Sequence, residues 1–360
     1  MNDRFNKVIE NMKDSNINQF IICDPGSIYY LTNQLYHTGH RMLALLISLD
    51  KEPELFIHEM FPTRDLKDIK VNYFKDGDDS LKMLYQALDK TKQVVVDKYF
   101  DARYVIGLRN FGLDLPIEVG SYLIDDLRGV KTDKEIELMK NASKINDKVM
   151  LELQDYISKA TDKITELALE KVLSQLYAKY TDEGYSFNPI IAFGINATDP
   201  HHVTDNTVLK KGDCIVIDIG CVKENYCSDM TRTCFYQEVS EFNKNIYNIV
   251  KEANEKAMAL VKPGIKFSEI DAIARNFITK QGYGEYFNHR LGHFIGTECH
   301  EAGDVSGINN NLVKEGNIFS IEPGIYIRDK KIGVRLENLV VVTKDGCESL
   351  NKISLDLKIL

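Results

Sequence analysis

Lys211-Gly-Asp-Cys-Ile-Val-Ile-Asp-Ile-Gly220 sets one carboxylate, Asp218, within an apolar run. The run is typical of a buried strand, and a lone buried carboxylate costs several kcal/mol unless a cation or a strong partner balances it. About a hundred residues later the pattern returns as Glu315-Gly-Asn-Ile-Phe-Ser-Ile-Glu-Pro-Gly324, and a gapless alignment matches Asp218 to Glu322. Two related strands that each bury one acid at the same place predict a duplicated unit with metal between its halves.

The composition is that of a globular protein. The chain has 360 residues, 44% of them apolar and 28% charged, which is enough for one or two domains with a sizeable core. The net charge of −9 and the lack of a Lys/Arg block argue against a nucleic-acid partner. No apolar run reaches membrane-spanning length and no secretory signal is visible, so we expect no membrane contact. Seven cysteines without a CxxC pair fit a reducing, cytoplasmic setting.

The first 127 residues alternate between strand patterns and amphipathic helix patterns, which predicts an α/β domain. The expected elements are strands at 18–23, 42–49, 53–58, 70–74 and 94–97, and helices at 4–13, 79–89 and from about 101.

Residues 128–360 contain the repeat and are expected to form an α+β domain. A long helix should begin at about 133, because Thr132-Asp-Lys-Glu135 has the pattern of a capping box. Ser268-Glu-Ile-Asp271 is expected to cap a later helix. The further elements are helices at 162–181, 241–261 and 268–280, and strands at 187–194, 214–219, 227–236, 317–328 and 333–343. Two helices followed by strands, twice over, agree with an internal duplication.

Four acids and one histidine form the candidate metal site. They are Asp218 and Asp229 in the first repeat, Glu322 and Glu337 in the second, and His293 between them. Four carboxylates repel one another unless about four positive charges lie among them, so two divalent ions would balance the set. Oxygen-rich ligation with one imidazole suits Mn, Co, Fe(II) or Zn.

Each candidate ligand has an ordinary explanation when it is taken alone. Asp229 could be a turn residue, Glu337 could form an ion pair with Arg335, and His293 could be a core histidine. The repetition of acids at equivalent positions in two halves favours the metal interpretation over these separate explanations.

Further histidines surround the candidate ligands. His201 precedes the first acidic strand and His300 precedes the second at similar distances. We expect both to face the site and to donate hydrogen bonds to a carbonyl or oxyanion, whereas the neighbouring His202 is expected to point elsewhere.

These residues resemble those of the M24 metallopeptidases, which have the "pita-bread" fold. The matching stretches are Asn196-Ala-Thr-Asp-Pro-His201, IDIG, SDMTRT, GHFIGTECHE, IEPGIYI and GVRLEN, and residues 24–32 are similar to the N-terminal domain of the proline-specific branch. The resemblance implies a pita-bread catalytic domain at 128–360 after a smaller α/β domain at 1–127. It also implies a homodimer that hydrolyses Xaa-Pro bonds in proline-containing peptides, with two divalent metal ions per subunit, Mn before Co, Zn or Fe.

Roles can be carried over from the family by position. The five candidate ligands would hold the metals, and Glu322 would also move the proton. His201 and His300 would steady the reacting carbonyl, His289 would line the proline side, and Arg335 would hold ligands or substrate.

Two departures from the family pattern bear on specificity. Phe294 replaces a small glycine after the ligand histidine and is expected to narrow a subsite. Asp304 stands where some dipeptide-specific prolidases have an arginine, and Arg41 is one cation that could substitute, across a dimer or as a solvated residue. We therefore expect an Xaa-Pro dipeptidase, with an Xaa-Pro aminopeptidase as the alternative. A non-catalytic binding module and a metal-free, creatinase-like hydrolase are disfavoured because all five ligands are present.

Overall fold

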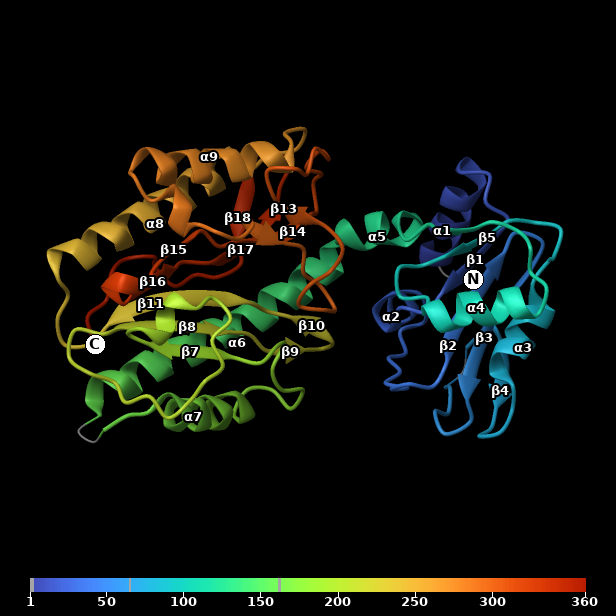
Figure 1. Cartoon of the computed structure of the whole chain (residues 1–360), viewed down its shortest axis with the longest axis horizontal. Coiled ribbons are helices and arrows are strands. Elements are labelled where there is room, and N and C mark those ends of the chain that lie inside the picture. The colour runs from blue at the N-terminus through green and yellow to red at the C-terminus, as the bar shows by residue number, and fades with distance from the viewer. Residues whose placement is uncertain (1–2, 65, 161–162) are drawn as a thin grey trace. The chain divides into compact units, whose positions relative to one another are not determined.

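The computed structural model describes residues 3–64, 66–160 and 163–360, and Figure 1 labels its elements. The chain divides into two compact units, Met1–Arg128 and Gly129–Leu360. Within the described ranges, no helix is both long enough and apolar enough to cross a membrane.

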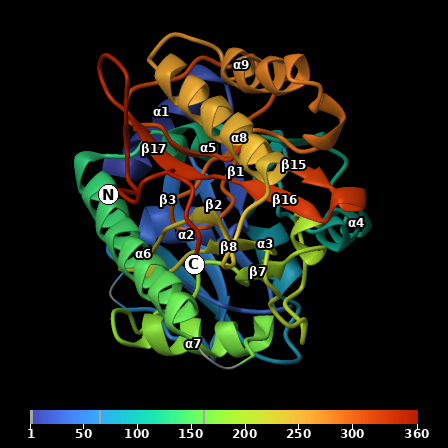
Figure 2. The same ribbon diagram turned by 90° about the vertical axis from the view of Figure 1, so that its left-hand side faces the viewer.

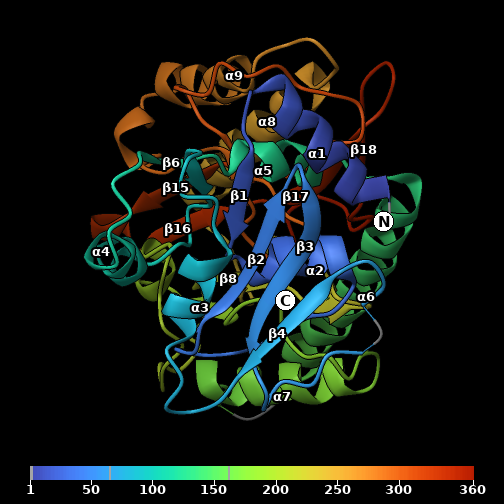
Figure 3. The same cartoon turned by 90° about the vertical axis from the view of Figure 1, so that its right-hand side faces the viewer.

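The first unit is built on a six-stranded mixed sheet, whose strands β1 to β4 lie side by side in Figure 3. The strands are β1 (Gln19–Ile22), β2 (Leu43–Ser48), β3 (Lys51–His58), β4 (Lys70–Phe74), β5 (Val94–Val96) and β6 (Ile117–Val119), in the order β4-β3-β2-β1-β5-β6. The helices are α1 (Asp3–Asp14), α2 (Pro25–Thr32), α3 (Ser80–Ala87), α4 (Ala102–Asn110) and α5 (Tyr122–Gly129). Alternate strand residues serve two cores, because Phe20 packs with Val8 of α1 and Ile21 packs with Leu84 of α3.

The expected strands and helices of this unit are all present, but α2, α5 and β6 are not among the expected elements. Helix α2 is short and is set by its cap. The Asp24 carboxylate accepts hydrogen bonds from the N–H groups of Gly26 and Ser27, and Pro25 occupies the first helical position.

The second unit places strands between two helix pairs. Its helices are α6 (Asp133–Lys159), α7 (Glu166–Ala178), α8 (Glu241–Leu260) and α9 (Phe267–Lys280), with 3-10 turns η1 (Asn196–Thr198), η2 (Gly284–Tyr286) and η3 (Arg328–Lys330). Its strands are β7 (Ile190–Phe193), β8 (Cys214–Ile219), β9 (Val222–Lys223), β10 (Tyr226–Cys227), β11 (Met230–Phe235), β12 (Gly292–His293), β13 (Asp304–Val305), β14 (Ile318–Ile321), β15 (Gly324–Ile327), β16 (Ile332–Arg335), β17 (Asn338–Val342) and β18 (Cys347–Ser349). In Figure 2, α6 and α7 lie on one side of the strands and α8 and α9 on the other.

The order of elements confirms the predicted duplication. Helices α6 and α7 precede the antiparallel sheet β7-β8-β11, and helices α8 and α9 precede the antiparallel pairs β14-β17 and β15-β16. The Thr132 capping box is also confirmed, because the Thr132 hydroxyl accepts the N–H of Glu135 and the Glu135 carboxylate accepts the N–H of Thr132.

Several expected boundaries differ in ways that matter for the site. The strands expected at 317–328 and 333–343 each split in two, at Glu322-Pro323 and at Leu336-Glu337. Proline has no N–H for a sheet ladder, so β14 ends just before it. The helix expected from 162 begins at Glu166 (residues 161–162 lie outside the described ranges). The Ser268 cap is wrong, because α9 begins one residue earlier and the Glu269 carboxylate accepts the N–H of Lys266.

Candidate metal centre and active site

A cavity of about 290 Å³ lies in the second unit, and residues of both halves line it. Its lining includes every candidate ligand and every candidate partner residue: Asp218, Asp229, His293, Glu322, Glu337, His201, His289, His300 and Arg335.

The alternation of side chains along β8 turns Asp218 toward the second half of the unit. Odd-numbered residues such as Ile215 and Ile217 pack in the core beneath α6 and α7, whereas Val216 packs in the core of α8 and α9. Successive side chains of a strand point to opposite faces, so Asp218 shares the face of Val216. Asp229 immediately precedes β11, the strand paired with β8.

The strand breaks of the second half place its acids in a similar way. Glu322 follows the last residue of β14, and Glu337 lies between β16 and β17. Both therefore sit where the ladder is interrupted and the side chain can turn inward to the cavity. Gly292 precedes the ligand histidine at a close approach, since a Cβ there would lie 1.9 Å from the Ser320 carbonyl oxygen.

The candidate ligands converge on one point. His293 Nε2 lies 3.5 Å from Asp229 Oδ2 and 3.5 Å from Glu322 Oε1. One donor atom each of Asp229, His293 and Glu337 lie within 4.8 Å of one another. Within the described ranges, Asp218 Oδ1, Asp229 Oδ1 and Glu337 Oε1 are buried and meet no hydrogen-bond donor. Unpaired buried oxygens are costly, so this donor set fits a cation.

The pKa values of the buried carboxyl groups also favour a bound cation at this site. Burial raises the pKa of Asp229 well above its ordinary value, and the negative charges of Asp218 and Glu322 raise it further. Burial likewise raises the pKa of Glu337, with Asp229 as the next cause. Oxygen donors that repel one another at short range, with one imidazole beside them, are the chemistry that divalent metal ions offset.

Arg335 is held in a buried network that contradicts the simple ion pair with Glu337. Its Nη2 lies 2.6 Å from Asp218 Oδ2, its Nε donates to Thr231 Oγ1 at 3.1 Å, and its Nη1 donates to the Tyr326 hydroxyl at 3.0 Å. The Thr231 hydroxyl in turn donates to Glu337 Oε2 at 2.7 Å. Arg335 thus orients two candidate ligands, one directly and one through Thr231.

Two of the histidines around the ligands, His289 and His300, have lowered pKa values. Burial, and then the charge of His293, lower the pKa of His300 to about 4, and the two rings lie 4.2 Å apart between centroids. Burial also lowers the pKa of His289. Its Nδ1 lies 2.7 Å from the Arg290 carbonyl oxygen, which can only accept, so a neutral His289 presents Nε2 as acceptor to the Tyr326 hydroxyl.

The three residues that were expected to influence substrate specificity do not line the cavity. Phe294 packs edge-on against Phe267 at 5.2 Å in the core, so the expected narrowing of a subsite is wrong. Asp304 Oδ1 accepts the Ser306 hydroxyl at 2.7 Å and does not line the cavity. Arg41 pairs with Asp76 of its own unit at 3.2 Å.

Sequence reasoning missed Arg290, Cys299 and Tyr326. Arg290 and Cys299 line the cavity, and Tyr326 bonds to two residues that do. Each falls within a stretch already singled out around His289, His300 or Glu322, so proximity in sequence was the available signal.

Comparisons with known proteins agree with this geometry. A model of metallopeptidase family M24 matches residues 137–344, and a model of the creatinase/prolidase N-terminal domain matches residues 4–106. An uncharacterized peptidase of Staphylococcus aureus strain MRSA252 is 33% identical, with 96% of this chain and 98% of the relative covered.

Two solved structures from Pyrococcus horikoshii OT3 are similar over nearly the whole chain. A dipeptidase has a TM-score of 0.90 at 32% identity and covers 99% of this chain and 100% of its own. A prolidase has a TM-score of 0.87 at 32% identity, with 98% and 99% covered. The chain therefore belongs to metallopeptidase family M24, and the donor set of its cavity fits the divalent metal of that family.

Proposed function

We propose that this chain is an Xaa-Pro dipeptidase that works with two divalent metal ions, Mn²⁺ before the others. The observation that carries the proposal is the set of converging donors with three unpaired buried carboxylate oxygens. The ligands we assign are Asp218, Asp229, His293, Glu322 and Glu337. The similarity to a dipeptidase and a prolidase supports the substrate class. We further propose a cytoplasmic homodimer with its domain boundary at 127/128.

Glu322 is the group we assign to proton transfer. When bound, two divalent ions would lower the pKa of a water molecule and offset charge on the scissile carbonyl. The side chain of Glu322 is 16% exposed, compared with 5% for Asp229, and Ser320 Oγ holds its Oε1 at 3.0 Å. The Asp218 carboxylate is instead held in an ion pair with Arg335. Glu322 is therefore the ligand best able to take a proton from water and pass it to the leaving nitrogen.

His300 and His201 complete the reaction site in this proposal. The lowered pKa of His300 keeps its imidazole neutral near pH 7, where it can donate a hydrogen bond to the carbonyl oxygen without adding positive charge beside the ligands. His201 enters the cavity from the other half, on the loop after β7. His289 lines the same cavity on the side of Tyr326.

Arg290 is the residue we assign to dipeptide preference. It is exposed and lines the cavity, and no carboxylate of the described residues forms an ion pair with it. The terminal carboxylate of an Xaa-Pro dipeptide lies one residue beyond the scissile bond, whereas a longer peptide has a neutral amide there. A free guanidinium at the cavity rim therefore favours the dipeptide.

Turnover of Xaa-Pro and Xaa-Pro-Xaa peptides tests the proposal. The wild type should prefer dipeptides, and Arg290→Gln should raise the dipeptide KM roughly tenfold, the lower end for a charge-assisted hydrogen bond at a solvated rim. Arg328→Gln, an exposed arginine outside the cavity, is the matched control and should change nothing. Equal or better turnover of longer peptides would favour the aminopeptidase. Metal binding without turnover of either peptide would indicate a binding module.

A further inference from the structure

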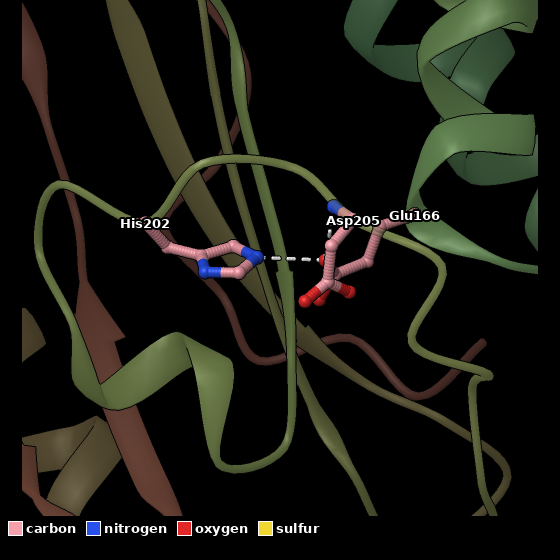
Figure 4. A group of neighbouring side chains, drawn as sticks. All are labelled: Glu166, His202 and Asp205. Carbon is pink, nitrogen blue, oxygen red and sulfur yellow. Dashed lines mark hydrogen bonds and ion pairs between the residues drawn. The ribbon is translucent and has the colours of Figure 1, made fainter.

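Glu166 is a fully buried carboxylate that lies outside the cavity. It is the first residue of α7, and its side chain is 0% exposed. Its Oε1 accepts the N–H of Phe193 at 2.7 Å and the side-chain amide of Asn196 at 3.0 Å. Its Oε2 lies 2.7 Å from His202 Nε2 and accepts the N–H of Asp205 at 3.0 Å (Figure 4).

One donor belongs to Phe193, the last residue of β7, and the others lie along the loop that follows it, residues 194–207. Further hydrogen bonds hold the two ends of the loop together. The Asn196 amide also donates to Thr207 Oγ1 at 2.9 Å, and the N–H of Leu167 in α7 donates to the Asp205 carbonyl at 3.0 Å. The tip of the loop is Pro200-His201, which lines the cavity. One buried carboxylate thus ties the base of the loop to the start of α7.

The contact with His202 fixes the direction of its neighbour. Figure 4 shows the His202 imidazole pointing toward Glu166, as the sequence-based expectation for this residue requires. His201, the preceding residue, lines the cavity instead. The backbone that holds His202 at Glu166 therefore also sets where His201 enters the site.

The same group of side chains does not offer the free oxygen atoms that a second metal site would need. Glu166, His202 and Asp205 offer atoms within 4.8 Å of one another, which is close enough for a cation. A carboxylate has about four lone-pair sites, and Glu166 uses four in the bonds described above. Asp205 Oδ1 is also occupied, since it accepts the N–H of Thr207 at 2.7 Å.

We propose that Glu166 is a positioning residue for His201, acting through the hydrogen-bonded clasp of Glu166, Asn196, His202 and Asp205. The inference rests on the proposed function in one respect, namely that His201 contacts the substrate. Displacement of a group beside the reacting atoms by about 1 Å can reduce turnover strongly. The clasp is expected to prevent such displacement.

Glu166→Gln tests the proposal, because it keeps the shape but presents an NH₂ group where the Asp205 N–H needs an acceptor. In the metal-loaded protein, kcat/KM for an Xaa-Pro dipeptide should fall roughly ten- to hundredfold, while metal content stays at the wild-type value. In a His201→Ala background, Glu166→Gln should cause no further loss beyond about twofold. An equal loss in both backgrounds, or no loss in either, would overturn the positioning role.

Three further variants control for a folding defect. His202→Gln keeps an amide donor toward Glu166 and should retain activity, whereas His202→Ala should lose it; equal losses would contradict the clasp. Glu183→Gln is the matched control, because the Glu183 carboxylate accepts the N–H groups of Glu224 and Asn225 at a turn outside the cavity, and activity should be unchanged.

Hydrogen exchange separates this inference from the proposed function. Amides of residues 194–207 should exchange faster in Glu166→Gln than in the wild type, whatever the substrate of the enzyme. A wild type that does not cleave Xaa-Pro peptides would refute the function, while unchanged exchange in this loop would refute the clasp.

Discussion

Thr231→Val removes one hydroxyl that joins a candidate ligand to the buried arginine. Thr231 Oγ1 donates to Glu337 Oε2 at 2.7 Å and accepts from Arg335 Nε at 3.1 Å, and the residue is 0% exposed. Valine has nearly the same shape, so the substitution removes the two hydrogen bonds with little change in packing. The Glu337 carboxylate then loses the contact that fixes its orientation.

The matched control is Thr233→Val on the same strand. The Thr233 hydroxyl donates to the Arg335 carbonyl at 2.9 Å and accepts the Arg335 N–H at 3.1 Å, and the residue is only 1% exposed. Both substitutions therefore delete two buried hydrogen bonds. They differ in that the Thr231 hydroxyl bonds to the ionisable side chains of Glu337 and Arg335, whereas the Thr233 hydroxyl bonds to backbone groups of Arg335.

The magnitudes follow from this difference. Bonds to charged groups contribute about 1.5–3 kcal/mol each and neutral ones about 0.5–1.5 kcal/mol. The metal-free Thr231→Val protein should thus lose about 3–6 kcal/mol in its free energy of unfolding, and Thr233→Val about 1–3 kcal/mol. Loss of a contact that orients a ligand typically lowers metal affinity roughly 10–100-fold, which we expect for Thr231→Val alone.

Urea unfolding of the metal-free proteins and competition with a chelating dye for Mn²⁺ measure the two quantities. Thr231→Val should have a lower free energy of unfolding and a lower Mn²⁺ affinity than the wild type, and Thr233→Val should keep the wild-type Mn²⁺ affinity. Equal metal affinities in the two variants would refute the role of Thr231 in orienting Glu337.

The other predictions concern ligands, protons and the loop that carries His201. Asp229→Asn and His293→Ala should lose metal and turnover together, and an unchanged metal stoichiometry in both would refute the ligand assignment. Burial raises the pKa of Asp229, so bound metal must displace protons and apparent affinity should rise with pH; calorimetry in buffers of different ionisation heat should detect proton release. Gly333→Ala would bring a Cβ to 1.7 Å from the Ala197 carbonyl oxygen, so kcat/KM should fall at constant metal content, whereas Gly346→Ala, with its nearest atom at 3.9 Å, should be neutral.

The duplicated strands could be predicted because their pattern is local. An acid in an apolar run, repeated at an equivalent position, needs only the period of a strand and the cost of a buried charge. The fold class and the repeat of two helices followed by strands followed from the same kind of pattern. The short helix α2 was missed because it depends on one cap at Asp24 rather than on periodicity.

The partners of the acids could not be read from sequence. Arg335 and Glu337 are two residues apart and would share a face in one continuous strand, but the strand ends at Arg335 and the guanidinium meets Asp218 instead. Phe294 likewise follows the ligand histidine in sequence yet packs in the core. Both outcomes depend on contacts between distant segments, which local spacing does not define.

The dependence of peptidase activity on metal tests the central claim most directly. The demetallated protein is titrated with Mn²⁺ while hydrolysis of an Xaa-Pro dipeptide and bound metal are measured together. The proposed centre predicts no turnover without metal and activity that saturates at about two ions per chain, the number that balances four carboxylates. Full turnover in the thoroughly demetallated protein would contradict it.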